Sequence, residues 1–357
     1  MAEKKVLNLA KPLLKTWASE SFVMSMILQQ ENAMDWVMNN YINMSGQYLV
    51  EKEAYCLCFF PNPDPYSLDV SMNIWNSCPF LETHFTAVDY VNSRYENILE
   101  YVMAVLEEGY YVCLFLSPGK LGISKRIKSH KTLVYGFDRA KNTIYVADHY
   151  DDGRFACAEV GCQQFLDAYE EAQREAELEY QEIWPQYFVI PKKQVIISRP
   201  RPYEYTFHPD WFRLQLKDYL EGTYSLHSTS FIYDGETGND RCFGINCYEL
   251  VQRHLDHVID APQLLDDDWR LATALYDHKY LLLQRARYFC QKGICDFEEG
   301  ELAQYETLYQ SAEIVMNRYL KFIVTNQIRH LKKIKELLVE MKSLELELLP
   351  RLLTKIS

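Results

Sequence analysis

Hydrophobic and polar residues alternate along this chain in two different ways, and the change comes near residue 200. In the first part, short runs rich in β-branched and aromatic residues predict strands, and apolar residues at helical spacing predict helices between them. The predicted strands cover 55–60, 110–116, 131–137, 143–147, 154–160 and 187–197. The predicted helices cover 16–43, 91–106 and 162–181. Strands and helices in this order indicate an α+β fold.

After Pro200-Arg201-Pro202, helical spacing continues almost to the end of the chain. Proline-rich segments of this kind often separate domains. The predicted helices cover 207–221, 245–259, 267–291 and a long element over 298–348, in which the apolar positions shift phase between Ile323 and Leu331. We therefore predict two domains, an α+β domain over 1–198 and a helical domain over 199–357.

One segment of the first domain predicts a β-hairpin with candidate catalytic residues at its open end. Its strands, 131–137 and 143–147, are joined by a polar turn over 138–142. If Phe137 pairs with Thr143, Asp148 lies opposite Thr132 and one diagonal step from His130, on the same face of the sheet. A histidine beside a buried carboxylate is the pairing of a general base with the group that orients it. The pattern lacks only a nucleophile.

The hairpin also resembles a known family. His130 is followed by Val134, Gly136, Phe137 and Asp138, then by a short turn and a hydrophobic strand that ends in Asp148. This order resembles the His/Asp half of the papain-like proteins typified by the butirosin-biosynthesis acyltransferase, and more distantly the cysteine peptidase domains of bacteriocin exporters. Residues 107–116 are similar to the central strand that precedes the hairpin in that family.

The resemblance covers about residues 15–170, and it implies a papain-like, cysteine-peptidase-type domain with an antiparallel sheet. The helical tail is similar in kind to companions found beside nonribosomal peptide synthetase genes. In the family a cysteine opens the first helix, but this chain has no cysteine before Cys56. The glutamine that such peptidases place upstream is also missing from 11–16.

Two serines, Ser19 and Ser21, stand where that helix would begin. A serine at a helix start is first of all a capping residue. The other interpretation makes Ser21 the catalytic nucleophile, because Phe22 and Met26 then follow on the buried face. Cys78, in a predicted loop before Pro79, is a further candidate nucleophile, whereas Cys113 in a buried strand would behave as a small hydrophobic residue.

Composition and charge limit the classes of partner that this chain is expected to bind. Hydrophobic residues make up 48% of the 357 residues, which argues against a disordered chain. The net charge of −13 argues against nucleic acid as a partner. A basic loop precedes the hairpin, and it is either a solvated surface or a site for an acidic carrier protein or its phosphopantetheine phosphate. Its cations are Lys120, Lys125, Arg126, Lys128 and Lys131.

Location and metal binding follow from simpler patterns. No apolar run suggests a secretory signal or a membrane span, and ten irregularly spaced cysteines favour reduced thiols, so we expect a cytoplasmic protein with no membrane partner. The pairs Cys242/Cys247 and Cys290/Cys295 lack zinc spacing, and His254 with His257 suits an exposed helix face better than a metal. We expect no metal and no cofactor, apart from phosphopantetheine presented by a carrier protein.

Two functional hypotheses remain. In the first, the chain is an acyltransferase or cyclase-type tailoring protein of nonribosomal peptide or related antibiotic biosynthesis. His130 would then deprotonate either Ser21 or an incoming small-molecule amine, with Asp148 orienting the imidazole, while a carrier protein presents the thioester. In the second, the chain is a papain-like scaffold or binding partner of a synthetase that has lost its nucleophile. The missing glutamine argues against a peptidase. The sequence leaves open whether the chain is an enzyme.

Overall fold

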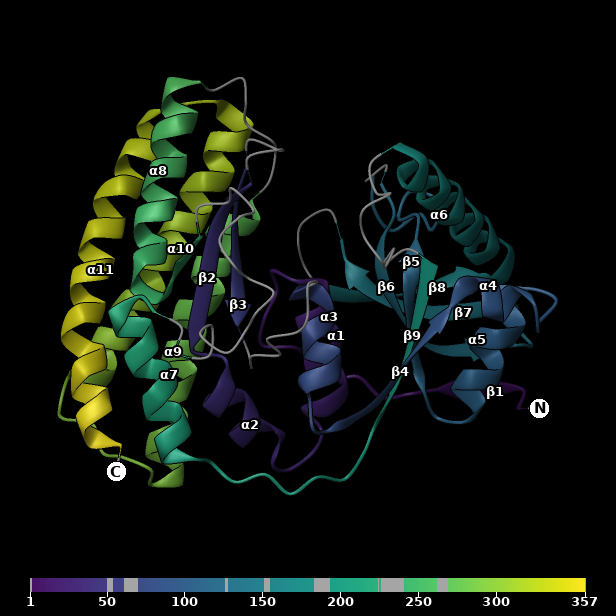
Figure 1. Ribbon diagram of the computed structural model, residues 1–357, viewed down its shortest axis with the longest axis horizontal. Coiled ribbons are helices and arrows are strands. Elements are labelled where there is room, and N and C mark those ends of the chain that lie inside the picture. The colour runs from purple at the N-terminus through teal and green to yellow at the C-terminus, as the bar shows by residue number, and fades with distance from the viewer. Residues whose placement is uncertain are drawn as a thin grey trace. The chain divides into compact units, whose positions relative to one another are not determined.

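The computed structural model describes residues 2–49, 54–60, 70–125, 128–150, 155–182, 193–223, 225, 241–261 and 269–356. The chain forms two compact units (Figure 1). The first unit contains residues 1–31 and 74–203, and the second contains 32–73 and 204–357. The predicted α+β layout, with an antiparallel sheet first and helices afterwards, is confirmed.

An antiparallel sheet is the centre of the first unit. Its strands lie in the order β4-β9-β5-β6-β7-β8, with β1 beside β6. The predicted strands around 110–116, 131–137 and 143–147 are neighbours in it. The bounds are β1 (Lys4–Val6), β4 (Leu81–Ala87), β5 (Tyr111–Leu116), β6 (His130–Asp138), β7 (Thr143–His149), β8 (Phe155–Gly161) and β9 (Gln194–Pro200).

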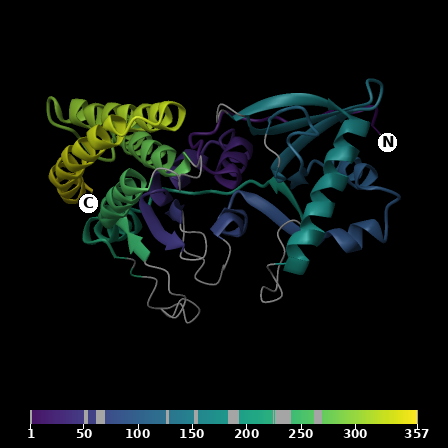
Figure 2. The same cartoon turned by 90° about the horizontal axis from the view of Figure 1, so that it is seen from above.

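Helices cover both faces of this sheet. The helix α1 (Ala18–Ile27) lies on one side, and α5 (Ile98–Glu107) and α6 (Cys162–Glu182) lie on the other, as Figures 1 and 2 show. Alternate strand residues such as Val112, Val134 and Val146 are buried under α5 and α6. The short helix α4 (Val88–Asn92) follows β4 and contacts it, and α3 (Val70–Ser77) contains the point between Asn73 and Ile74 at which the chain passes from one unit to the other.

The β6–β7 hairpin changes register along its length. Near the turn, Asp138 pairs with Thr143 and Phe137 with Ile144, one residue away from the pairing that we predicted. A β-bulge between Val134 and Gly136 then shifts the register, so that Leu133 pairs with Ala147. At the open end this places Thr132 opposite Asp148, as predicted, although the turn alone would not have done so.

The second unit combines a small sheet with helices. The strands β2 (Asn43–Leu49), β3 (Ala54–Phe60) and β10 (Arg241–Phe243) pair in the order β10-β2-β3. Residues 32–73 therefore belong with the helices after 204, and the single division at residue 198 that the sequence suggested does not describe the units. The helices are α2 (Ala33–Asn40), α7 (Pro209–Glu221), α8 (Cys247–Asp260), α9 (Arg270–Lys292), α10 (Glu301–Thr325) and α11 (Arg329–Lys355), with a short 3₁₀ turn over Gly244–Asn246.

The predicted long element over 298–348 is two helices. α10 ends at Thr325, and the next residue, Asn326, takes the left-handed conformation with φ of 52°. α11 begins at Arg329. The phase shift in the apolar pattern therefore marks an interruption between two helices and not a bend within one helix.

A buried polar network stabilises the core of the second unit. Lys279 forms an ion pair with Glu345, and both side chains are fully buried. The hydroxyls of Tyr219 and Tyr248 donate to the two Glu345 oxygens at 2.6 and 2.9 Å. His278 Nε2 donates to the carbonyl of Ile42 at 2.8 Å. The network thereby connects α7, α8, α9 and α11 to the start of β2.

Candidate functional site

The predicted base and carboxylate meet at the open end of the β6–β7 hairpin. His130 Nδ1 lies 3.0 Å from Asp148 Oδ1, and Thr132 Oγ1 donates to Asp148 Oδ2 at 2.8 Å. The backbone N–H of His149 donates to Oδ1 at 2.7 Å. Asp148 is 1% exposed, so three donors satisfy a carboxylate that water hardly reaches. Thr132 was not predicted as part of the site, although its register opposite Asp148 was visible in the sequence.

The hydrogen bonds determine which nitrogen of His130 is available. Because the Asp148 carboxylate accepts, Nδ1 is the donor, so in the neutral imidazole Nε2 carries the lone pair. No described residue forms a hydrogen bond with Nε2, and 32% of the His130 side chain is exposed. His130 can therefore accept a proton from a bound group.

Ser21 occupies a different environment. It is the fourth residue of α1 and is fully buried. Its hydroxyl donates to the carbonyl of Leu14 at 2.8 Å, and its oxygen lies 3.2 Å from His149 Nε2. Since the single hydroxyl proton is used on Leu14, His149 Nε2 must be the donor to Ser21. In this arrangement His149 does not activate the serine.

The structure places Ser21 and His130 on opposite faces of the sheet. Side chains alternate along a strand, so Asp148 and His149 point to opposite faces of β7. Asp148 bonds to His130 on one face, and His149 bonds to Ser21 on the other. No hydrogen bond joins Ser21 to His130 in the described part of the chain. No local sequence pattern predicts the role of His149, because its partner comes from a helix more than a hundred residues away.

The capping interpretation of the two serines is wrong. The N-cap of α1 is Trp17, whose side chain makes no capping hydrogen bond, and both serines lie inside the helix. Ser19 lies inside the helix, is buried, and its Oγ has no hydrogen-bond partner among the described residues.

The cysteine alternative does not provide a nucleophile either. Cys78 was expected in an accessible loop, but it is buried, and burial raises the pKa of its thiol to about 12. Cys113 is buried as predicted, and burial raises its pKa to about 12 as well. Both thiols therefore stay protonated at neutral pH, whereas the thiolate is the reactive form.

The basic loop before the hairpin divides into exposed and buried cations. Lys120, Lys125 and Lys128 are exposed. Lys131 is buried, with Nζ 5.9 Å from the centroid of the Phe115 ring. Arg126 lies outside the described residues. The exposed lysines leave both interpretations of the loop open.

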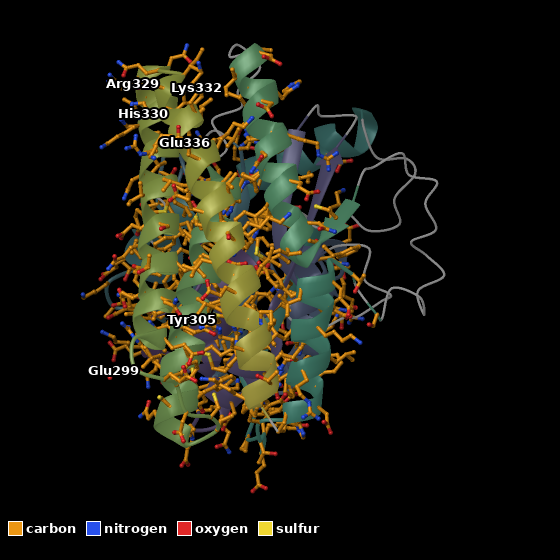
Figure 3. All side chains as sticks on the ribbon, turned by 90° about the vertical axis from the view of Figure 1, so that its left-hand side faces the viewer. Glu299, Tyr305, Arg329, His330, Lys332 and Glu336 are labelled. Carbon is orange, nitrogen blue, oxygen red and sulfur yellow. The ribbon has the colours of Figure 1, made fainter. Side chains whose placement is uncertain are left out.

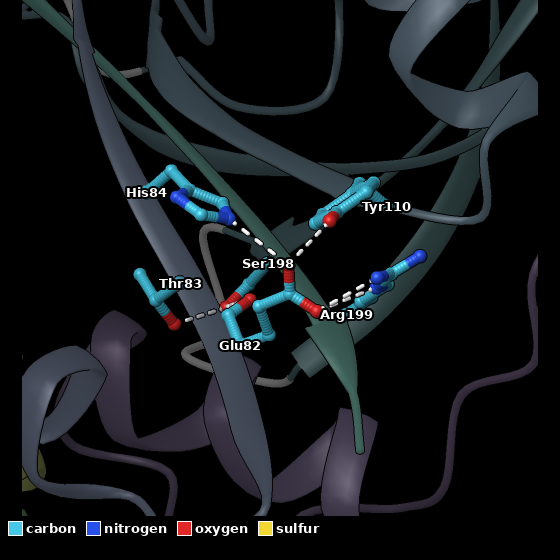
Figure 4. A network of polar contacts seen from close by, with 6 residues as sticks. All are labelled: Glu82, Thr83, His84, Tyr110, Ser198 and Arg199. Atoms are coloured by element: carbon cyan, nitrogen blue, oxygen red, sulfur yellow. Dashed lines mark hydrogen bonds and ion pairs between the residues drawn. The ribbon is translucent and has the colours of Figure 1, made fainter.

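A second polar cluster surrounds Glu82 on the edge strand β4 (Figure 4). Its carboxylate accepts from Tyr110 Oη at 2.7 Å, from His84 Nε2 at 3.1 Å and from Arg199 at 2.8 Å. The hydrogen bond from Tyr110, followed by those from His84 and Arg199, lowers the pKa of Glu82 to about 2. A carboxylate that stays ionised and fully bonded connects β4, β9 and the start of β5, and it does not exchange protons at neutral pH.

The described residues contain no group of three or more His, Cys, Asp or Glu side chains placed to hold a metal ion. His254, considered above as a ligand, bonds instead to the hydroxyl of Tyr319 at 2.8 Å. Within the same residues, no helix has the length and apolar character needed to cross a membrane.

No protein-family model matches this sequence, and no protein of curated function matches it. Since no similar protein suggests a function, a functional proposal has to rest on the geometry of the site, and above all on the His130–Asp148 pair.

Proposed function

We propose that the chain is an acyltransferase or cyclase-type enzyme in which His130 acts as a general base on a thioester reaction. The proposal includes the papain-like character of the first unit, a carrier protein that presents the thioester through phosphopantetheine, and a role in nonribosomal peptide or related antibiotic biosynthesis. The observation that carries it is the bond between His130 Nδ1 and the buried, fully bonded Asp148, which leaves Nε2 with its lone pair.

The reaction that fits this pair needs no serine or cysteine. The amine of a small acceptor attacks the thioester carbonyl, and Nε2 of His130 removes a proton from that amine. The carbon–nitrogen bond forms, the carbon–sulfur bond breaks, and the imidazolium returns its proton to the leaving thiolate. Asp148 stabilises the imidazolium and keeps the imidazole oriented throughout. Burial of Ser21 and its bond to Leu14 favour this direct transfer over an acyl-enzyme on the serine.

The same burial of Ser21 supports a second candidate function. A papain-like unit whose nucleophile position is inaccessible could serve as a binding partner or scaffold of a peptide synthetase. In that case the hydrogen bonds of Asp148 would stabilise the hairpin and nothing more.

Comparison of His130→Ala and Asp148→Asn with the wild type separates the two functions. Each protein is mixed with a carrier protein that bears an aminoacyl thioester, and with simple amines as acceptors. Amide product is measured by mass spectrometry, and carrier binding by anisotropy. The enzyme proposal predicts that His130→Ala loses about 10²–10⁴-fold in rate while binding is retained.

His84→Ala is the matched control, because His84 is an exposed histidine of the same unit that also contacts a carboxylate. It should leave the rate unchanged. Equal product formation in the wild type and both site variants, or carrier binding without any product, would leave the scaffold as the function.

A further inference from the structure

The end of α10 and the start of α11 carry an unusual charge pattern. Between Glu313 and Glu336 the sequence has six lysines and arginines and no carboxylate, in a chain whose net charge is −13. These cations are Arg318, Lys321, Arg329, Lys332, Lys333 and Lys335. We name this segment, residues 314–335, the basic tip.

Four cations of the basic tip form no ion pair with any described residue: Arg318, Lys321, Arg329 and Lys332. Several exposed cations elsewhere on the same group of helices are paired with carboxylates. Arg287 contacts Glu306 at 2.6 Å, and Arg351 contacts Glu347 at 2.6 Å. Lys333 and Lys335, at the base of the tip, also have acidic partners, Glu336 and Asp256. Unpaired positive charge is therefore concentrated at one end of the helices.

Three of the unpaired cations, Arg318, Lys321 and Arg329, act electrostatically on His330. Burial lowers the pKa of His330, and the positive charges of Arg329, Arg318 and Lys321 lower it further. His330, Arg329 and Lys332 lie together at this end of the helices (Figure 3). Only residues 326–328 separate α10 from α11, so cations of both helices act on one spot.

Two exposed aliphatic side chains lie within the basic tip. Val324, in the last turn of α10, is 84% exposed, and Leu320, one turn earlier, is more than one third exposed. Single exposed aliphatic residues are common, but these lie among unpaired cations. A partner that covered the tip could bury them and neutralise the charge together.

We propose that the basic tip docks against an acidic face of a partner protein, with carboxylates opposite the four unpaired cations and an aliphatic contact over Val324. A nucleic acid or an anionic membrane would extend its negative charge well beyond the tip. The rest of this chain is strongly acidic and would repel such an extended anion. A compact acidic protein surface avoids that repulsion, and it also makes use of the exposed aliphatic residues. This inference does not rest on the proposed function.

The test uses the full chain and a fluorescent helical peptide of glutamate and leucine, with binding followed by anisotropy at low and high salt. Arg329→Glu combined with Lys332→Glu should weaken binding about ten-fold, because two attractive contacts become repulsive. Arg287→Glu combined with Arg351→Glu changes the net charge equally at exposed, paired positions, and it should change binding by less than about two-fold. Circular dichroism confirms that both double variants are folded.

A second measurement reports directly where on the chain the peptide binds. Bound carboxylates should raise the pKa of His330. The pKa is measured by NMR titration, and the His330→Gln variant assigns the signal. Equal weakening in the two double variants, or no binding and an unchanged His330, would overturn the proposal. Tighter tip-dependent binding of single-stranded DNA or of vesicles containing phosphatidylserine would overturn it as well, as would tip-dependent self-association of the chain in place of peptide binding.

Discussion

At the scale of single residues, the serine at the expected nucleophile position holds α1 against the sheet. Its hydroxyl donates to Leu14 and its oxygen accepts from His149, and all three groups lie where water is scarce. The rings of Phe22 and Phe155 pack around His149, with centroids 6.5 and 5.8 Å away. Ser21 therefore has a structural role that the sequence position alone would not suggest.

Replacement of Ser21 by alanine should cost about 1–3 kcal/mol of unfolding free energy, because it removes the hydrogen bonds that the Ser21 hydroxyl makes with a buried carbonyl and with the buried His149 ring. Urea denaturation measures the change. Ser25→Ala is the control: Ser25 is equally buried in α1, but its hydroxyl bonds only to the carbonyl of Phe22 in the same helix. A loss for Ser21→Ala no larger than that for Ser25→Ala would contradict this role.

The His130–Asp148 contact was within reach of sequence reasoning because both residues belong to one hairpin, although the register that joins them also depends on a β-bulge in β6. Sequence reasoning was insufficient for Ser21. Its partner, His149, depends on how α1 packs against a strand far along the chain, and no local pattern records that packing. Cys78 was misjudged for the same reason, since burial of a loop residue is a tertiary property.

At the scale of elements, the β-bulge in β6 brings the site residues together. The pairing near the turn, continued without the bulge, would place Asp148 opposite Leu133 and on the wrong face for His130. The predicted contact is therefore correct at the open end through a feature that the sequence did not reveal. Gly136 beside the bulge also lets β1 approach, since a Cβ there would lie 2.7 Å from the Lys5 carbonyl.

Gly136→Ala should displace β1 from β6 and cost about 1–3 kcal/mol, because the new methyl group meets backbone atoms that cannot easily move. Hydrogen exchange of the Leu7 amide, which donates to Tyr135 at 2.8 Å, should become faster. Gly161→Ala is the comparison, since its Cβ would meet nothing closer than the Gln164 Cβ at 4.0 Å. Similar exchange and stability in both variants would show that β1 tolerates the methyl group.

Local periodicity predicts the individual strands and helices better than it predicts which of them belong to the same compact unit. The phase shift within 298–348 was visible, but the left-handed Asn326 that separates α10 from α11 was not. Pairing of β2 with β10 joins residues almost two hundred positions apart, so a division of the chain by composition could not find it.

At the scale of the molecule, each unit has its own core, and that of the second unit depends on buried ionisable groups. Burial lowers the pKa of His278 well below its usual 6.5, and the charges of Lys279 and Arg285 lower it further. His278 is therefore neutral in the folded chain. Below pH 6.5 the unfolded chain takes up a proton at His278 that the folded chain does not, so the free energy of unfolding falls as the pH falls.

His278→Gln should remove this pH dependence. Between about pH 5 and pH 6 the wild type should lose up to about 1.4 kcal/mol per pH unit through this residue, and the variant should lack that contribution. Urea denaturation over this range measures the slope. Equal slopes for the wild type and His278→Gln would mean that His278 protonates in the folded state.

The role of His130 as a base that needs no serine nucleophile is tested most directly by the first-turnover rate of amide formation from a carrier-bound aminoacyl thioester. The rate is measured side by side in Ser21→Ala and His130→Ala, at a temperature where both variants are folded. We expect Ser21→Ala to stay within about three-fold of the wild type and His130→Ala to fall by about 10²–10⁴-fold. A loss in Ser21→Ala as large as that in His130→Ala, with an acyl group found on Ser21 of the wild type, would contradict direct transfer.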